Sequence, residues 1–200
     1  MSRSSPAQKI KIGLFGGSFD PIHHGHLIVA EWLLNELELN SVYFVPVYKH
    51  AFRRKSEITP AQQRLEMVQL ATQDFEKFEV SDFEISKKGT SYTIDTVRFF
   101  KKKFPDARLF VFIGGDNLAE FHLWKDYQIL LELATFVVYD RPGGQMPDRL
   151  PKEKFLFVKA PLIEISSTII RQRCKAGKSV KSLIPLPVWQ YIQQNHLYSA

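Results

Sequence analysis

Three histidines lie close together in a glycine-rich segment near the N-terminus, at positions 23, 24 and 26. The segment follows residues 9–15, which alternate like a β-strand, and precedes apolar residues at helical spacing. A glycine turn there lets a ligand approach the backbone, and the free amides and dipole of a helix N-terminus attract an anion. Histidine side chains can donate hydrogen bonds to phosphate oxygens. The segment therefore predicts a phosphate-binding turn.

Other roles for these histidines fit their surroundings less well. Metal ligands would need partners, and no acidic or cysteine residue stands at a standard zinc spacing, so we expect no metal site. Surface histidines without a function would not be expected three together beside a glycine turn. Gly25 lies between two of them and removes a side chain that would crowd a bound nucleotide.

A second candidate segment is residues 165–171, Ile-Ser-Ser-Thr-Ile-Ile-Arg. Ser166 or Ser167 can cap a helix, and the hydroxyl groups with the free amides form a second anion cradle. Arg171 stands three residues after Thr168 and emerges near the same face, where a guanidinium can hold phosphate oxygens at two points. Alone, the segment is more typical of a capped amphipathic helix with a surface arginine.

Together the two segments resemble the H-x-G-H and I-S-S-T-x-x-R signatures of the nucleotidyltransferase superfamily. Class I aminoacyl-tRNA synthetases share the first signature but carry a lysine-rich second one and are much longer. The resemblance implies that His23 and His26 stabilise the transition state while Arg171 holds phosphates. It also implies an ATP site made of Gly16, Gly17, Ser18, Phe19, Gly25, Ser166, Ser167 and Thr168.

A third group of residues indicates the acceptor of the transferred group. The helix expected to start near Ser91 could receive a carboxylate on its free amides, and Trp124 offers a flat face to a ring, although a lone tryptophan is more often core. Residues 91–96, 114–116 and 124–125 resemble the S-Y-T-x-x-T, G-x-D and W-[KRY] elements of nicotinate mononucleotide adenylyltransferases. The turn at residues 141–143 fits as well, so the resemblance extends over residues 10–197.

This resemblance implies a mononucleotide site. Thr93 and Trp124 would hold the nicotinate ring, and Asp116 would bind ribose hydroxyls. Bacterial members often carry Pro-Pro-His-Lys after the second strand, whereas residues 48–55 here read Tyr-Lys-His-Ala-Phe-Arg-Arg-Lys, so which cation contacts phosphate stays open. The remaining candidates are Thr90, Tyr92, Gly114, Lys125, Lys49 and His50.

The implied reaction joins the mononucleotide to ATP. The phosphate of the mononucleotide attacks the α-phosphorus of ATP, and pyrophosphate leaves. Mg²⁺ accompanies ATP. A phosphate monoester has a second pKa of ~6 and needs no general base. Amide donors favour nicotinate mononucleotide, because a carboxylate accepts at both oxygens, but nicotinamide mononucleotide stays an alternative. Pantetheine-phosphate adenylyltransferases share the chemistry and are shorter.

The order of elements predicts an α/β fold: a doubly wound, Rossmann-like parallel sheet with helices on both faces, in a single domain over residues 10–200 after a disordered tail at 1–9. Ligands bind beyond the carboxyl ends of such strands. Thr59 is expected to cap a helix to residue 73, with Gln62 completing a capping box. Strands are expected at 9–15, 42–45, 78–85, 109–113, 136–139 and 155–158, and further helices at 91–103, 117–133, 167–177 and 187–196.

Composition limits the class of protein. The 200 residues are 44% hydrophobic, enough for a core, and the single cysteine allows no intramolecular disulfide. With no signal peptide or apolar run near the ~20 residues of a membrane span, we expect a cytoplasmic protein without membrane contact. The net charge of +6 would suit a nucleic-acid-binding module, but basic residues are scattered. The expected partners are ATP and nicotinate mononucleotide, and a homo-oligomer stays open.

Overall fold

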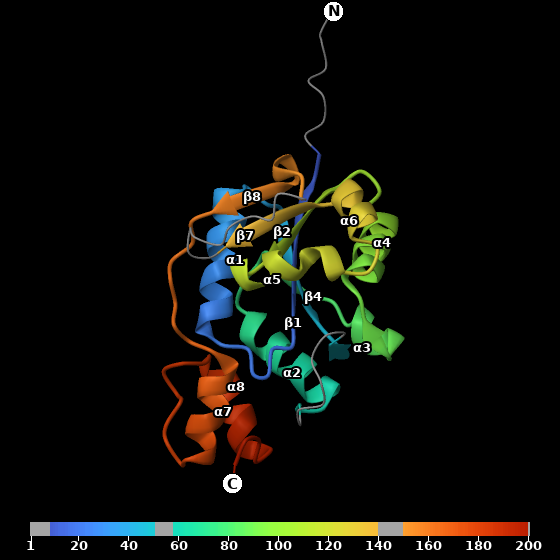
Figure 1. Cartoon of the computed structure of the whole chain (residues 1–200). Coiled ribbons are helices and arrows are strands. Elements are labelled where there is room, and N and C mark those ends of the chain that lie inside the picture. The colour runs from blue at the N-terminus through green and yellow to red at the C-terminus, as the bar shows by residue number, and fades with distance from the viewer. Residues whose placement is uncertain (1–8, 51–57, 140–149, 200) are drawn as a thin grey trace, which may run out of the picture.

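A parallel β-sheet lies between two layers of helices in the computed structural model, which describes residues 9–50, 58–139 and 150–199 (Figure 1). In chain order the elements are β1 (Lys11–Gly17), α1 (His24–Glu36), β2 (Ser41–Pro46), β3 (Lys49–His50), α2 (Ala61–Thr72), β4 (Phe78–Val80), α3 (Phe83–Lys87), β5 (Thr90–Ser91), α4 (Thr93–Lys103), β6 (Arg108–Ile113), α5 (Gly115–Glu120), the 3-10 helix η1 (Phe121–Leu123), α6 (Tyr127–Leu133), β7 (Thr135–Tyr139), the 3-10 helix η2 (Lys152–Lys154), β8 (Phe155–Val158), α7 (Ser167–Lys175) and α8 (Leu186–Gln194).

The main sheet has the strand order β4-β2-β1-β6-β7-β8, and every pairing in it is parallel. The chain builds outward from β1 through β2 to β4, and then returns to β6 on the other side of β1. The strand order therefore reverses between β1 and β6, which makes a crevice beyond their carboxyl ends the expected ligand site. The doubly wound fold predicted from the sequence is confirmed.

Alternation along the central strands explains why both faces of the sheet are covered. In β6, Phe110 and Phe112 pack into the core that contains α1, α2 and α8. Leu109, Val111 and Ile113 of the same strand pack into the second core, with α4 and α6. Because neighbouring side chains point to opposite faces, one apolar strand supplies both cores.

The C-terminal helices lie beside the carboxyl edge of the sheet (Figure 1). Ile170 of α7 and Val188 of α8 are buried in the same core as α1. The carbonyl of Leu183, between the two helices, accepts a 3.1 Å hydrogen bond from the backbone N–H of His24. Residues more than 150 positions apart are thereby brought to one place. In the part of the chain that the structure describes, no helix combines the length and apolar character of a membrane span.

The segment 78–85 was expected to be one strand, and this prediction is wrong. β4 ends at Val80, and α3 begins at Phe83. The Phe83 ring stacks on Phe99 of α4 at a centroid distance of 4.2 Å, and the next residue, Glu84, is buried. Apolar residues at 83 and 85 fit a strand or a short helix equally well, so the contact with α4 decides between them.

The capping box expected at Thr59 is also absent. Helix α2 begins at Ala61 with Pro60 at the N-cap position, and no side chain within the described residues caps it. Gln62 instead donates a hydrogen bond to Glu66 one turn along, while the Thr59 carbonyl accepts from Arg64. The two-residue strands β3 and β5 were not predicted, because two residues carry no periodicity. The tail expected at 1–9 falls, apart from Lys9, outside the described residues.

We expect Gly13→Ala to destabilise the fold. An added Cβ would lie 2.7 Å from Cζ of Phe112 and 3.0 Å from Cδ1 of Leu39, both in the core. Overpacking of this kind costs about 1–3 kcal/mol, which urea unfolding would measure. The matched control is Gly16→Ala in the same strand, where no atom lies within 4 Å of the added Cβ. Equal stability of the two variants would contradict the close packing of Phe112 and Leu39 on Gly13.

Candidate active site

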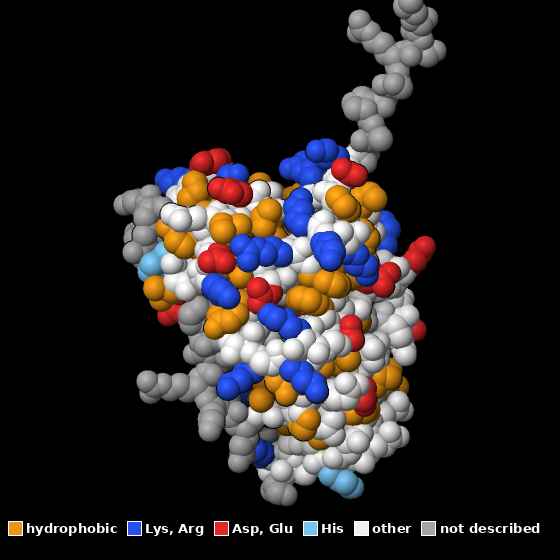
Figure 2. Space-filling view, turned by 90° about the vertical axis from the view of Figure 1, so that its right-hand side faces the viewer, with side chains coloured by type: hydrophobic (Ala, Val, Ile, Leu, Met, Phe, Trp, Pro, Cys, Tyr) orange, Lys and Arg blue, Asp and Glu red, His pale blue; other side chains and the backbone are white. Residues whose placement is uncertain are grey.

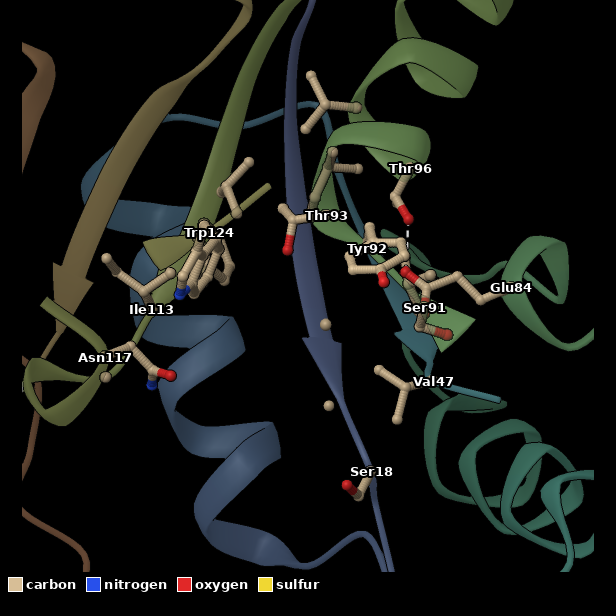
Figure 3. A pocket seen from close by; sticks show the side chains of 18 of the residues that line it. Ser18, Val47, Glu84, Ser91, Tyr92, Thr93, Thr96, Ile113, Asn117 and Trp124 are labelled. Atoms are coloured by element: carbon tan, nitrogen blue, oxygen red, sulfur yellow. Dashed lines mark hydrogen bonds between the residues drawn. The ribbon is translucent and has the colours of Figure 1, made fainter. Parts of the chain in front are cut away.

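A cavity of about 480 Å³ opens at the carboxyl ends of β1 and β6, where the strand order reverses. Its walls come from the turn after β1, the first turn of α4, and the segment from α5 to η1 (Figure 3). The structure thus brings together residues that the sequence assigned to two different substrates. The lining includes Gly16, Gly17, Ser18, Phe19, His26 and Ser167 from the expected ATP site, and Tyr92, Thr93, Gly114, Trp124 and Lys125 from the expected mononucleotide site.

Two histidines at the start of α1 are held in a fixed relation. The backbone N–H of His23 donates to Nδ1 of His26 at 3.2 Å, and the two rings stack with centroids 3.7 Å apart. Because Nδ1 of His26 accepts this hydrogen bond, the neutral ring carries its proton on Nε2. His26 is therefore a hydrogen-bond donor in the wall of the cavity.

Burial keeps both of these rings neutral. It lowers the pKa of His23 to about 4, with a further contribution from the charge of His24. The pKa of His26 is also lowered well below its ordinary value by burial and by His23. Both imidazoles are uncharged near neutral pH, and they can stabilise an anion as neutral donors or take up a proton when one binds.

His23 does not line the cavity but stands behind His26. Its Nδ1 is buried and has no hydrogen-bond partner among the described residues. Gly25 packs against this ring, because a Cβ there would lie 3.0 Å from Nδ1 of His23. Gly25 therefore leaves room for the His23 ring, and its expected role beside a bound nucleotide stays a prediction.

The start of α7 is bound to the histidine turn. Ser167 donates from Oγ to the Pro21 carbonyl at 2.9 Å, and Arg171 donates from Nη1 to the Asp20 carbonyl at 2.6 Å. The cap of α7 is Ser166, whose Oγ accepts from the N–H of Ile169 at 3.2 Å. The two signature segments consequently form one unit. Of the second segment Ser167 lines the cavity, whereas Ser166, Thr168 and Arg171 are not among the lining residues.

Asp20 is a buried carboxylate that the sequence interpretation did not assign a role. Its Oδ1 accepts a 2.7 Å hydrogen bond from the hydroxyl of Tyr198, and its Oδ2 lies 3.9 Å from Nη1 of Arg171. Burial and the neighbouring carboxylate raise the pKa of Tyr198. The C-terminal residues thus brace the same turn, through a contact that no local sequence pattern announces.

The opposite wall of the cavity comes from α4 and the segment after α5. Thr93 and Trp124 lie on either side of the cavity in Figure 3. Trp124 also packs on Phe121 at 5.1 Å, so the ring is part of the core and of the wall. The Nζ of Lys125 lies 4.7 Å from the centre of the Tyr92 ring, a cation–π distance that places a positive charge at this wall.

Glu84 is a further polar side chain at this wall that sequence reasoning missed. It is buried in α3, and one carboxylate oxygen accepts from the hydroxyl of Thr96 in α4. Its other oxygen is buried without a partner among the described residues. Burial raises the pKa of Glu84, against the opposing effect of Ser91 and Thr96 hydroxyls. Glu84 fell within the strand wrongly expected at residues 78–85, and a single glutamate there carries no sequence signal of this contact.

The remaining candidates lie beside this wall or outside the described residues. Lys49 and His50 form β3, which pairs with Thr90 and Ser91 of β5. The structure places Gly114 at the N-cap of α5, with Asp116 in its first turn, but does not describe the Asp116 side chain. Residues 51–55, which include the basic residues 53–55, and the turn at 141–143 also lie outside the described residues.

A six-stranded parallel sheet with a histidine turn at its switch point defines the class of a Rossmann-like nucleotidyltransferase. Residues 14–173 match the model of the cytidylyltransferase-like family, and the chain belongs to that family. Within it, the chain belongs with the nicotinate-nucleotide adenylyltransferases. It is 40% identical over 197 residues to a protein of Clostridium tetani named "Probable nicotinate-nucleotide adenylyltransferase", covering 94% of this chain and 98% of the relative.

Other relatives agree with this placement. A protein of the same name from Methylacidiphilum infernorum is 41% identical over 192 residues, covering 94% of this chain and 92% of its own. Among solved structures, nicotinic acid mononucleotide adenylyltransferase of Plasmodium falciparum complexed with NaAD superposes with a TM-score of 0.77. The superposition covers 94% of this chain and 97% of that one at 21% sequence identity, which is evidence for the shared fold.

The buried imidazole of His23 predicts a loss of stability in mild acid. In the unfolded chain the ring takes up a proton near its ordinary pKa of 6.5, whereas in the folded protein it does so only near 4. The free energy of unfolding should therefore fall by about 2 kcal/mol between about pH 7.5 and pH 5 from this group. Urea unfolding at the two pH values would measure it.

His23→Asn should remove this part of the pH dependence, and His196→Asn, at an exposed position, should retain it. An unchanged pH dependence in His23→Asn would show that His23 is not held neutral.

Proposed function

We propose that this protein transfers AMP from ATP to nicotinate mononucleotide, giving nicotinate adenine dinucleotide and pyrophosphate in the synthesis of NAD. The observation that carries the proposal is the single cavity shared by the histidine turn and the wall around Thr93 and Trp124. Two substrates that react with each other must bind next to each other in one cavity. The curated relatives named for this reaction, at about 40% identity, support the same conclusion.

On the ATP side, the proposed contacts are backbone amides of Gly16 to Phe19 and the Nε2 proton of His26. Arg171 donates from Nη2 to Oγ1 of Thr168 at 3.4 Å, and the two would contribute positive charge and a hydroxyl donor to the bound phosphates. ATP enters as its Mg²⁺ complex, since Mg²⁺ is usually held through substrate phosphates and retains several waters. A Plasmodium falciparum structure of the same fold is complexed with APC, an ATP analogue, which supports ATP as a substrate here.

On the mononucleotide side, the proposed ring site lies between Thr93 and Trp124, where the indole offers a flat face. The N-terminus of α4 and Lys125 supply donors and positive charge for a carboxylate, which favours nicotinate over nicotinamide. Gly114 and Asp116 at the start of α5 would bind the ribose, and Lys49 or His50 the phosphate. Thr90 and Tyr92 would then shape the edge of the site.

The chain's own residues need only position the two substrates and neutralise the negative charge of their phosphates. The mononucleotide phosphate is ionised, so no side chain has to remove a proton, and its oxygen forms the new bond as the bond to pyrophosphate breaks in line. Charge grows on the transferring group and on the leaving pyrophosphate. Fixed donors of His26 and the α1 N-terminus face this charge without reorganising, which is the larger part of the expected rate enhancement.

The face shown in Figure 2 gives the nucleic-acid-binding alternative no support. On the face shown in Figure 2, Lys and Arg side chains are interspersed with acidic, apolar and uncharged groups. A continuous basic stripe would be needed to follow a phosphate backbone.

Pyrophosphate release by the purified protein with ATP and Mg²⁺ tests the proposal directly. We expect strong turnover with nicotinate mononucleotide and weaker turnover with nicotinamide mononucleotide, because the amide cannot accept at both positions. Turnover with phosphopantetheine alone would keep the chemistry but refute the ring site at Trp124. Absence of turnover with all three acceptors would refute the proposed function.

His26→Ala should lower kcat by about two to three orders of magnitude, because it removes a preorganised donor to the developing charge. The measurement is steady-state pyrophosphate release at saturating substrates. His196→Asn is the control, since this exposed residue lies away from the cavity. A His26→Ala rate within a few-fold of the parent would show that the histidine does not act on the transition state.

A further inference from the structure

Arg64 is a fully buried arginine in α2 that neither substrate site includes. Its three hydrogen-bond acceptors are all backbone carbonyls: Nε donates to Thr59 at 2.9 Å, Nη1 to Ser18 at 2.7 Å and Nη2 to Tyr48 at 3.2 Å. Burial lowers the pKa of Arg64, and the charge of Asp20 opposes this effect. A buried charge is costly to desolvate, so its presence here calls for a specific role.

The carbonyls belong to segments that serve different substrates. Ser18 follows the glycines of β1 in the proposed ATP turn, and it lines the cavity. Tyr48 immediately precedes Lys49 of β3, in the segment proposed for the mononucleotide phosphate. One rigid guanidinium thus fixes the end of the β1 turn relative to the segment that follows β2.

The backbone of Tyr48 is also held by a second hydrogen bond. Its N–H donates to Oγ of Ser91 at 3.1 Å, directly before the first turn of α4. Ser91 lies near Glu84, which accepts from Thr96 within α4 (Figure 3). Contacts therefore run without a break from the ATP turn through Arg64, Tyr48 and Ser91 to the wall proposed for nicotinate.

We propose that Arg64 is a positioning residue that sets the two substrates in register for in-line transfer, acting through the carbonyls of Ser18 and Tyr48. It cannot touch either substrate, because no part of it is exposed in the cavity. Lysine cannot replace it, since an ammonium group lacks the planar fork that reaches three separate carbonyls. This inference rests on the proposed AMP transfer between two substrates.

The test compares Arg64→Lys with the parent protein in single-turnover AMP transfer and in calorimetric binding of each ligand alone. We expect the transfer rate to fall about 100-fold, as a small misplacement of reacting groups does, while each separate Kd stays within about threefold. The matched control is Arg173→Lys, an exposed arginine that also donates to a backbone carbonyl, that of Ser179. It should retain the parent rate.

A rate for Arg64→Lys within about threefold of the parent would overturn the inference, and so would a loss accounted for by weaker binding of one ligand. If Arg64→Lys does not fold, Ser91→Ala breaks the same chain of contacts on the other side of Tyr48. Ser91→Ala should also lower the transfer rate, by about tenfold, while the Kd of each ligand alone stays nearly unchanged. A parent-like rate would again overturn the inference.

Absence of turnover in the parent would refute the proposed function and leave the inference to a second measurement. Nicotinate mononucleotide is then titrated into protein saturated with a non-hydrolysable ATP analogue. Arg64→Lys is expected to weaken this second binding by about fivefold or more relative to the parent, since both anions must fit one register. An unchanged second affinity would overturn the inference.

Discussion

The structure depends on the burial of a parallel sheet on both faces. Parallel strands need crossover connections, which here place helices on either side of β1 and β6 and bring every carboxyl end to the same edge. Since the strand order reverses between β1 and β6, the segments that follow them diverge and leave the cavity. The glycines that end β1 and the start of α5 after β6 line this cavity because they lie at the carboxyl edge of the main sheet, and the start of α4, which follows β5, also lines it.

Placing the segments along the sheet edge is not sufficient to form the site. Hydrogen bonds between α7 and the histidine turn fix these segments relative to each other. Ser167 and Arg171 hold the carbonyls of Pro21 and Asp20, so that α7 cannot move independently of the histidine turn. Tyr198 joins the same cluster from the C-terminus. These contacts explain why the second signature is distant in sequence yet inseparable from the first. They also explain why the guanidinium of Arg171 faces the turn.

Apolar alternation was enough to predict the sheet, because strands such as β6 serve two cores and read as dense apolar runs. Histidines and glycines near a strand end indicated a turn before α1, but Gly16 and Gly17, expected to form it, end β1 and pair with Val45 and Pro46. Arg64, by contrast, binds carbonyls 5, 16 and 46 positions away, and carbonyls have no sequence signature. The cap expected at Thr59 is absent, and the Thr59 carbonyl instead accepts from Arg64. The strand expected to continue to residue 85 ends early, and Phe83 stacks on Phe99. Arg64 was missed and the strand mispredicted because their partners, Ser18, Tyr48 and Phe99, are distant in sequence.

The site retains polar groups that the fold alone would not select. His23 and Glu84 each keep a buried atom without a partner in the described chain, and Arg64 keeps a buried charge. Such groups cost free energy wherever they serve stability only. Their concentration around one cavity indicates that they preorganise it, holding donors in place before an anion arrives so that little reorganisation remains for the reaction. A neutral, stacked histidine pair is suited to this, because it stays compatible with burial until the charge of a phosphate makes a proton on the ring favourable.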